Sequence, residues 1–137
     1  MVKKYGQVSV EYLMIFGFVT MAVIIILGVA LNYSGTMKDN IKFTQIKSYA
    51  DKIITTSESV FYAGEPSKAT ISCYLPEGVK EVQVTENSLF ITVETHTGTN
   101  DIAYSSKVPI SGSLSSGGGM KKIEVVANET SITLTEI

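Results

Sequence analysis

The side chain best placed to do chemistry near the start of the chain is the carboxylate of Glu11, which stands beside a long apolar run. Residues 12–31 contain no charged side chain, and Thr20 is their only clearly polar member. A carboxylate at the centre of a membrane helix costs about 2.5 to 3.5 kcal/mol, and less near the interface, so a position at the end of the run is tolerable. This spacing predicts charge pairing at the end of an apolar helix.

The other residue types that commonly react or bind metals stand alone. Cys73 is the only cysteine and His96 the only histidine, so the sequence offers no intramolecular disulfide and no clustered zinc ligands. No nucleophile elbow or base-orienting pattern accompanies the serines, and the 13 acids are spread through strand and turn patterns. We therefore expect no catalytic residue, no metal site and no cofactor.

Composition limits the classes of partner. The chain has 137 residues, of which 45% are hydrophobic and 18% charged, and its formal net charge is −2. The basic residues are scattered lysines without interleaved aromatic side chains, so no nucleic-acid partner is expected.

The element that positions Glu11 is a hydrophobic helix over residues 7–31. At about 1.5 Å per residue, the uncharged run spans roughly 30 Å, the thickness of the hydrocarbon core of a bilayer. The alternative, a core helix of a soluble protein, needs apolar cover on every side, which the β-rich remainder of the chain is too small to supply. We expect burial in a membrane or in a bundle of helices.

A second helical segment is expected over residues 41–63, after a polar stretch, residues 32–40, that reads as a helix interruption or a hinge. Its apolar positions recur at helical spacing and predict one buried side: Ile46, Tyr49, Ala50, Ile53, Ile54, Ser57, Val60 and Phe61. Gly64 and Pro66 mark its end, so residues 7–64 form the N-terminal helix in this interpretation.

Residues 65–137 show the two-residue period of strands. Five or six short strands are expected, in segments 68–75, 79–86, 89–95, 102–110, 121–127 and 130–137, with Ile71, Cys73 and Leu75 sharing one face. Residues 111–120 read as an exposed Gly/Ser-rich loop. The predicted fold class is α+β: a long N-terminal hydrophobic helix followed by a small antiparallel β-sheet head.

The residues before the apolar run are typical of a processed leader. A common secretory signal is cut after its hydrophobic region at small residues, and no such site follows Leu31. Lys3 and Lys4 instead precede Gly6-Gln7, a plausible cut just before the apolar run.

With Ser9 and Glu11, the stretch GQVSVEYLM resembles the class III signal peptide of euryarchaeal type IV pilin-like proteins. The resemblance covers roughly the first 31 residues. It implies that a prepilin peptidase removes residues 1–6 between Gly6 and Gln7 and leaves the helix on the mature chain. It further implies assembly into a cell-surface filament, for adhesion or another task, by a cytoplasmic ATPase and a membrane platform protein. Before assembly, the precursor would reside in the cell membrane.

In such a filament Glu11 has a natural partner. Cleavage would create an amino group at Gln7, one helical turn away, which is cationic at neutral pH. At an effective dielectric of 20, a pair about 4 Å apart attracts by about 4 kcal/mol, much of it offset by desolvation, so correct register is the larger benefit. A simple interfacial carboxylate remains the alternative. Gly17 and Gly28, with Ala22 and Ala30, would allow neighbouring helices to approach closely.

Two N-glycosylation sequons begin at Asn32 and Asn128 and suit an exported, glycosylated head, although such triplets also arise by chance. The interpretation is a structural pilin subunit rather than an enzyme. The alternatives are a minor or pseudopilin-type subunit and a single-span, membrane-anchored binding module.

Overall fold

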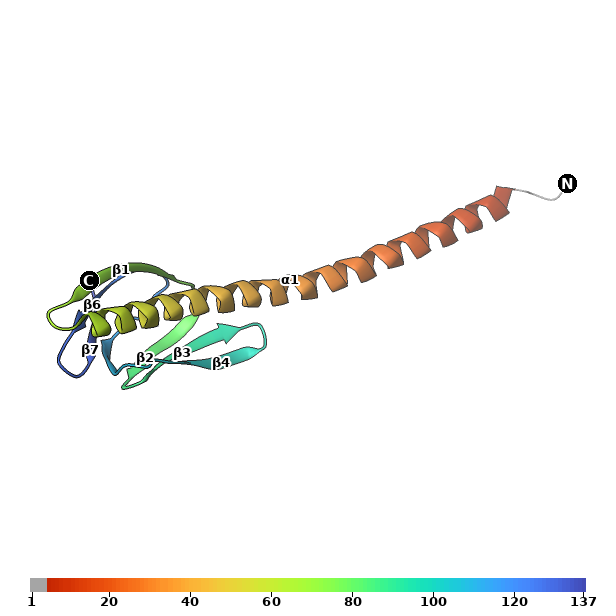
Figure 1. Cartoon of the computed structure of the whole chain (residues 1–137). Coiled ribbons are helices and arrows are strands. Elements are labelled where there is room, and N and C mark those ends of the chain that lie inside the picture. Colours follow the sequence, from red (N-terminus) through yellow and green to blue (C-terminus); the bar gives the residue numbers. More distant parts are fainter. Residues whose placement is uncertain (1–4) are drawn as a thin grey trace. The chain divides into compact units, whose positions relative to one another are not determined.

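One long helix and seven strands make up the part of the chain that the structure describes. The computed structural model describes the backbone of residues 5–137 and the side chains of residues 9–137 (Figure 1). Helix α1 comprises Tyr5–Ala63. The strands that follow are β1 (Lys68–Leu75), β2 (Val79–Thr85), β3 (Ser88–Thr95), β4 (Gly98–Ser105), β5 (Ile110–Ser113), β6 (Gly119–Ala127) and β7 (Ile132–Glu136). The predicted α+β class, a long apolar N-terminal helix followed by a small β-sheet domain, is confirmed.

The chain divides into two compact units, Met1–Lys38 and Asp39–Ile137. Helix α1 continues through residues 32–40, so the predicted interruption is absent. At the start of this stretch the Asn32 side-chain amide donates to the Gly28 carbonyl at 3.0 Å within the helix. Helical residues 41–63, which the sequence analysis grouped with the N-terminal helix, belong by their contacts to the β head.

Helix α1 ends where the sequence predicts. Ala63 is its last residue, and Gly64 follows with a φ of 80°, a conformation that glycine adopts without steric cost. The Gly64 N–H donates to the Phe61 carbonyl at 3.1 Å and so satisfies one of the last carbonyls of the helix.

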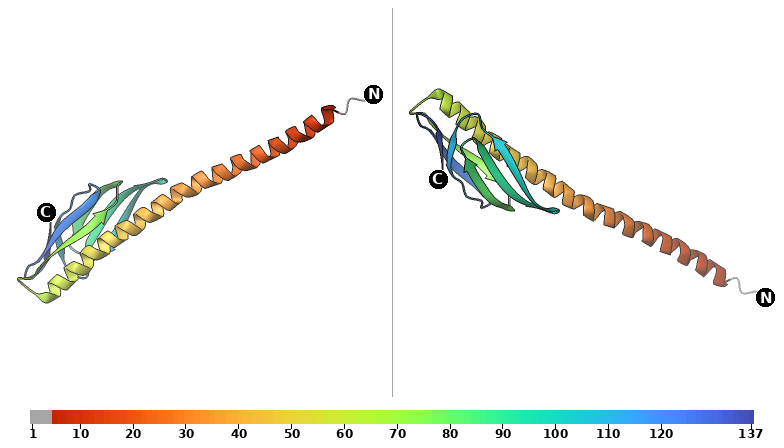
Figure 2. Two further views of the ribbon diagram at one scale, coloured as in Figure 1. Left: turned by 90° about the horizontal axis from the view of Figure 1, so that it is seen from above. Right: turned by 90° about the horizontal axis from the view of Figure 1, so that it is seen from below.

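The strands form two sheets with the orders β1-β6-β7-β5 and β2-β3-β4. All pairs are antiparallel except β5 with β7, which is parallel, so the expectation of an antiparallel sheet holds for most of the head but not for β5. The β5 edge of one sheet contacts β2 of the other, and the Ile110 N–H donates to the Glu86 carbonyl at 2.7 Å. Figure 2 shows the strands lying along the C-terminal part of α1.

Two details of the strand prediction are wrong. Segment 102–110 is not one strand, because β4 ends at Ser105 and β5 begins only at Ile110. The Ser106 hydroxyl donates to the Val108 carbonyl at 2.8 Å and folds the chain between them. The expected loop 111–120 is also too long, since β5 and β6 take residues from both its ends and residues 114–118 remain.

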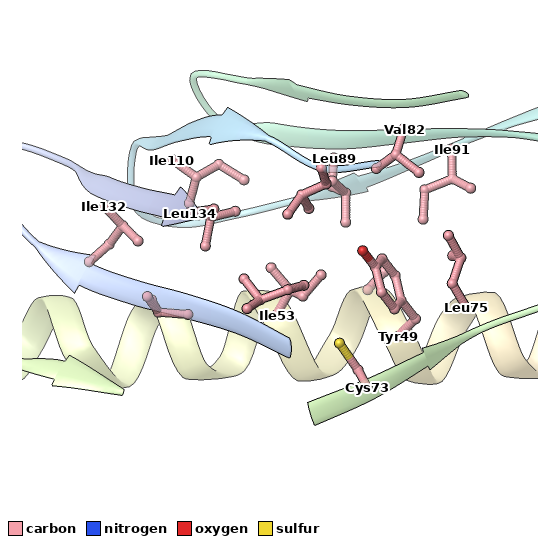
Figure 3. Packing of buried hydrophobic residues seen from close by; sticks show 14 of the residues in the cluster. Tyr49, Ile53, Cys73, Leu75, Val82, Leu89, Ile91, Ile110, Ile132 and Leu134 are labelled. Carbon is pink, nitrogen blue, oxygen red and sulfur yellow. The ribbon is translucent and has the colours of Figure 1, made fainter. Parts of the chain in front are cut away.

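The core lies between the helix and the sheets. Ile46, Tyr49, Ala50 and Ile53 of α1 are at most 1% exposed, as the helical spacing predicts. In Figure 3, Tyr49 and Ile53 lie toward buried side chains from both sheets, among them Leu75, Leu89, Ile91, Ile132 and Leu134. In β1, Cys73 and Leu75 are buried and Ile71 is half-buried, which confirms the predicted shared face.

Candidate functional site: the exposed apolar helix and its amino end

The apolar part of α1 has no cover within the described chain. Every side chain from Ser9 to Leu31 is exposed except Ala22, which is intermediate. Phe18 is 76% and Leu31 75% exposed. Among the described residues, α1 is the one helix long and apolar enough to cross a membrane, and its most apolar window is 0% buried. This helix is compatible with membrane anchoring.

Polar side chains in and next to this segment are satisfied within the helix. The Thr20 hydroxyl donates to the Phe16 carbonyl at 2.8 Å, and the Asn32 amide donates to the Gly28 carbonyl at 3.0 Å. In hydrocarbon no water replaces a missing hydrogen bond, so such internal bonds lower the cost of placing these residues in or near lipid.

Tyrosines stand near both ends of the apolar segment. Tyr12 is 72% and Tyr33 68% exposed. They are 21 positions apart, or roughly 30 Å along a helix. Tyrosine is enriched where a membrane helix meets the headgroups, because its ring is apolar and its hydroxyl is polar. The sequence analysis missed this pair, although the spacing is visible in the sequence.

The residues of the expected processing motif are described to different extents. Lys3 and Lys4 lie outside the described residues. Gly6 and Gln7 lie in the first turn of α1, where only the backbone is described. Ser9 and Glu11 are exposed on the helix, and Glu11 takes part in no ion pair among the described side chains. The Glu11 carboxylate is therefore open to a partner from outside residues 9–137.

The two helix glycines make no close approach within the described chain. A Cβ added at Gly17 or Gly28 would meet no atom within 4 Å. Their small size is thus not required by packing inside one copy.

Both sequon asparagines are exposed. The Asn128 amide donates to the Thr133 hydroxyl at 2.8 Å, and the Asn128 N–H donates to the Ser131 carbonyl at 2.9 Å, which fixes the turn before β7. Asn32 lies on α1 and bonds back to its own helix. Modification at Asn128 would have to displace the Thr133 contact.

Cys73 and His96 have structural roles. The Cys73 side chain is buried against β6, and burial raises the pKa of its thiol, so little thiolate is present at neutral pH. His96 lies in the two-residue turn between β3 and β4, and its backbone N–H donates to the Asp39 carboxylate at 3.0 Å. Among residues 9–137, no three His, Cys, Asp or Glu side chains gather where a metal ion could bind.

A groove on the head was not predicted. It has a volume of about 370 Å³ and runs between α1 and β1, lined by Tyr49, Lys52, Cys73, Tyr74 and Met120 together with Thr44, Gln45, Ser48 and Ser72. The Lys52 ammonium crosses it and donates to the Ser72 carbonyl at 2.6 Å. Sequence periodicity could not reveal it, because it depends on the distance between a helix and a strand that are 20 residues apart.

A half-buried polar cluster was also missed. The Lys121 ammonium contacts the Glu136 carboxylate at 2.8 Å, with 14% and 26% of the two side chains exposed. Ser115 donates to the same carboxylate from its backbone N–H and from its hydroxyl, both at 2.8 Å. The cluster ties loop 114–118 to β6 and β7.

In comparisons with models of known protein families, with curated proteins and with solved structures, nothing matches this chain.

Proposed function

We propose that this chain is the precursor of a type IV pilin-like subunit, a structural protein that polymerises through its N-terminal helix. In this proposal a prepilin peptidase cuts between Gly6 and Gln7, the helix stays on the mature chain, and the β head is exported. The role is structural rather than catalytic. The machinery expected with it is an assembly ATPase and a membrane platform protein.

The observation that carries the proposal is the contrast between the two parts of α1. From Ile46 onward one face of the helix is buried against the strands, whereas the apolar side chains of residues 9–31 are exposed or, at Ala22, intermediate. Large exposed apolar surfaces mark contacts with lipid or with other protein chains. One surface can serve both, first in the membrane and then against the helices of other copies.

The position of Glu11 favours the proposed filament subunit over a single-span membrane anchor. A permanent anchor gains nothing from a carboxylate at this position, because the charge raises the cost of insertion. In a bundle of processed chains, the new ammonium at Gln7 would offset the charge of a Glu11 on a neighbouring helix. A helix displaced by one turn would leave both charges unpaired, so the pair would select the register of the filament.

A minor or pseudopilin-type subunit would use the same residues and differ only in abundance. A single-span anchored binding module would keep residues 1–6. Processing therefore separates the anchor from both kinds of pilin.

The test is the intact mass of the membrane-associated and surface forms in cells that express the chain. We expect the wild type to lack residues 1–6. Gly6→Phe should retain them, because a bulky residue at the cut blocks the peptidase. The matched control Gly17→Phe, eleven residues further along in the exposed helix, should be processed normally. A wild-type chain that is never cut would exclude the pilin proposal and support the anchor.

A further inference from the structure

Two strand edges of the head are open. β1 ends the four-stranded sheet and β4 ends the three-stranded sheet, while the other two ends, β5 and β2, contact each other. An unpaired strand edge presents a row of backbone donors and acceptors that can pair with another strand.

The register shows which groups of β4 are free. Opposed residues of an antiparallel pair alternate between bonded and non-bonded pairs. The Ser106 N–H donates to the Asn87 carbonyl at 2.8 Å, so the bonded series in β4 runs through even-numbered residues. The intervening residues point their N–H and C=O groups away from β3: Thr99, Asp101, Ala103 and Ser105.

The backbone groups of the β4 edge are unpaired within residues 9–137. All four of these residues are exposed, and their outward backbone groups have no partner within residues 9–137. Proteins usually guard such edges with lysine, proline or a bulge. β4 contains neither lysine nor proline, and its pairing with β3 is regular over eight residues.

The β1 edge is guarded by one contact. The Ala127 N–H donates to the Ser67 carbonyl at 2.9 Å, so even-numbered residues of β1 face the open edge. Of these outward groups, the Ser72 carbonyl accepts the Lys52 ammonium at 2.6 Å. Lys52 thus occupies the position that the N–H of an added strand would take.

Lysines predominate beside β1. Lys52 covers its edge, Lys68 begins the strand, and Lys122 lies opposite Ser72 on β6. The one carboxylate in this group is Glu124, which lies 3.4 Å from the Lys68 ammonium.

Carboxylates predominate beside β4. Asp101 is exposed on the strand itself, and Glu94 lies opposite Thr99 on β3. Lys80 pairs with Glu94 at 3.4 Å and offsets one of these charges.

The helix adds two more carboxylates along β4. Asp39 accepts from the His96 N–H before the strand, and Glu58 accepts from the Lys107 N–H after it at 3.3 Å. Lys107 itself and Lys42, which donates to the Glu94 carbonyl at 3.3 Å, partly offset them. The β4 edge keeps an excess of negative charge, whereas the β1 edge keeps an excess of positive charge.

We propose that β4 of one copy pairs with the open edge of β1 of a second copy, so that the heads join edge to edge in the polymer. The inference rests on the proposed function, because it concerns contacts between assembled subunits. Pairing β4 with β4 would bring two acidic edges together, and pairing β1 with β1 would bring two basic edges together. The mixed pair is complementary in charge, and a contact between two different surfaces repeats from copy to copy instead of closing as a dimer.

Lys52 has a defined role in this arrangement. In the unassembled chain its ammonium covers the Ser72 carbonyl and protects the β1 edge. On assembly the incoming β4 backbone would replace it, and Lys52 would be released toward the carboxylates that flank β4.

The test is a charge exchange in the full-length chain, measured as filament yield from sheared cells. Asp101→Lys and Lys122→Glu should each lower the yield about tenfold, which corresponds to about 1.4 kcal/mol of contact free energy. The double variant should restore most of the yield, because it exchanges the two charges across the same interface. Glu129→Lys, a charge reversal in the exposed turn between β6 and β7, is the control and should leave the yield unchanged.

A second measurement tests proximity. Thr70→Cys and Ala103→Cys in one chain, with Cys73 replaced by alanine, should give a ladder of multimers when filaments are treated with a short bismaleimide. Either single-cysteine variant should give no ladder. The edge pairing would be overturned if the wild type forms filaments but the two-cysteine variant gives no ladder and the double charge variant does not regain its yield. This result would leave the pilin proposal intact. A wild-type chain that forms no filaments would overturn both.

Discussion

Glu11 and Glu136 are two carboxylates in opposite situations within one chain. Glu136 has its partners in the folded head, where Lys121 and Ser115 donate to it. Glu11 is exposed, and we propose that its partner comes from a second copy. The first partnership could not be predicted, because it joins residues that meet only after β6 and β7 pair. The second could be proposed from sequence, because its position relative to the apolar run is local.

Glu11→Val tests the proposed docking role. The substitution keeps the apolar helix and removes the charge that the new amino terminus would meet. We expect processing to continue and incorporation into filaments to fall about tenfold, the effect of about 1.4 kcal/mol of lost contact free energy. The measurement is the ratio of filament to membrane forms on a quantitative immunoblot. Normal filaments from Glu11→Val would contradict the proposed docking role of Glu11. Glu129→Val is the control for the loss of an exposed charge.

Glu136 predicts a dependence of stability on pH. Burial disfavours its charged form, but hydrogen bonds from Lys121 and Ser115 outweigh burial and hold the pKa of Glu136 below its ordinary value of 4.5. A carboxyl with a lowered folded-state pKa contributes stability that is fully present above the unfolded pKa and is lost as the pH falls through the folded pKa.

Glu136→Gln should therefore cost about 1 to 2 kcal/mol of unfolding free energy at neutral pH. The difference from wild type should shrink as the pH is lowered from about 6 to about 3. Urea unfolding of the detergent-solubilised chain, followed by circular dichroism, measures both. A difference that stays constant over this range would contradict the assigned cause.

At the scale of elements, α1 shows what a hydrophobic pattern can and cannot predict. Continuous apolarity over residues 12–31 and helical spacing from Ile46 to Phe61 predicted two different environments. The structure agrees: the first segment is exposed and the second lies against the strands. The unbroken helix through residues 32–40 was not predicted, because glycine and asparagine lower helix propensity without forbidding helix when both flanks are strongly helical.

The strands show the same limit. β1 matches its predicted bounds because its alternation is undisturbed, and its buried residues are Cys73 and Leu75. The parallel pairing of β5 with β7 could not be predicted, because it joins Ile110–Ser113 to a strand beyond β6. Gly112 allows the two strands to approach closely, because its φ is 136° and a Cβ at this position would clash with the Leu134 carbonyl oxygen.

A pair of isoleucines tests the contrast within α1. Ile53 is 0% exposed and Ile25 is 56% exposed. Ile53→Ala should lower the unfolding free energy of the head by about 2 to 5 kcal/mol, because it removes buried contacts and leaves a cavity. Ile25→Ala should change the stability of the head by less than about 0.5 kcal/mol. Thermal unfolding in detergent measures both, and equal effects would contradict the division of the helix into a buried part and an exposed part.

At the scale of the whole molecule, residues 39–137 form a head with its own core, and the described chain leaves the apolar part of α1 uncovered. The sequence predicted the apolar segment from hydrophobicity alone, but it placed residues 41–63 with the N-terminal helix rather than with the head. It could not predict which strand edges remain open, since these follow from the order of seven strands. In the proposed polymer, these edges would give the head a second contact between copies, in addition to the helix.

The most direct test of the central claim is mass spectrometry of subunits released from sheared surface filaments. The account predicts that the filaments contain this chain, beginning at Gln7 and retaining residues 7–31. Filaments that lack the chain, with the polypeptide found only in the membrane and still carrying residues 1–6, would contradict it.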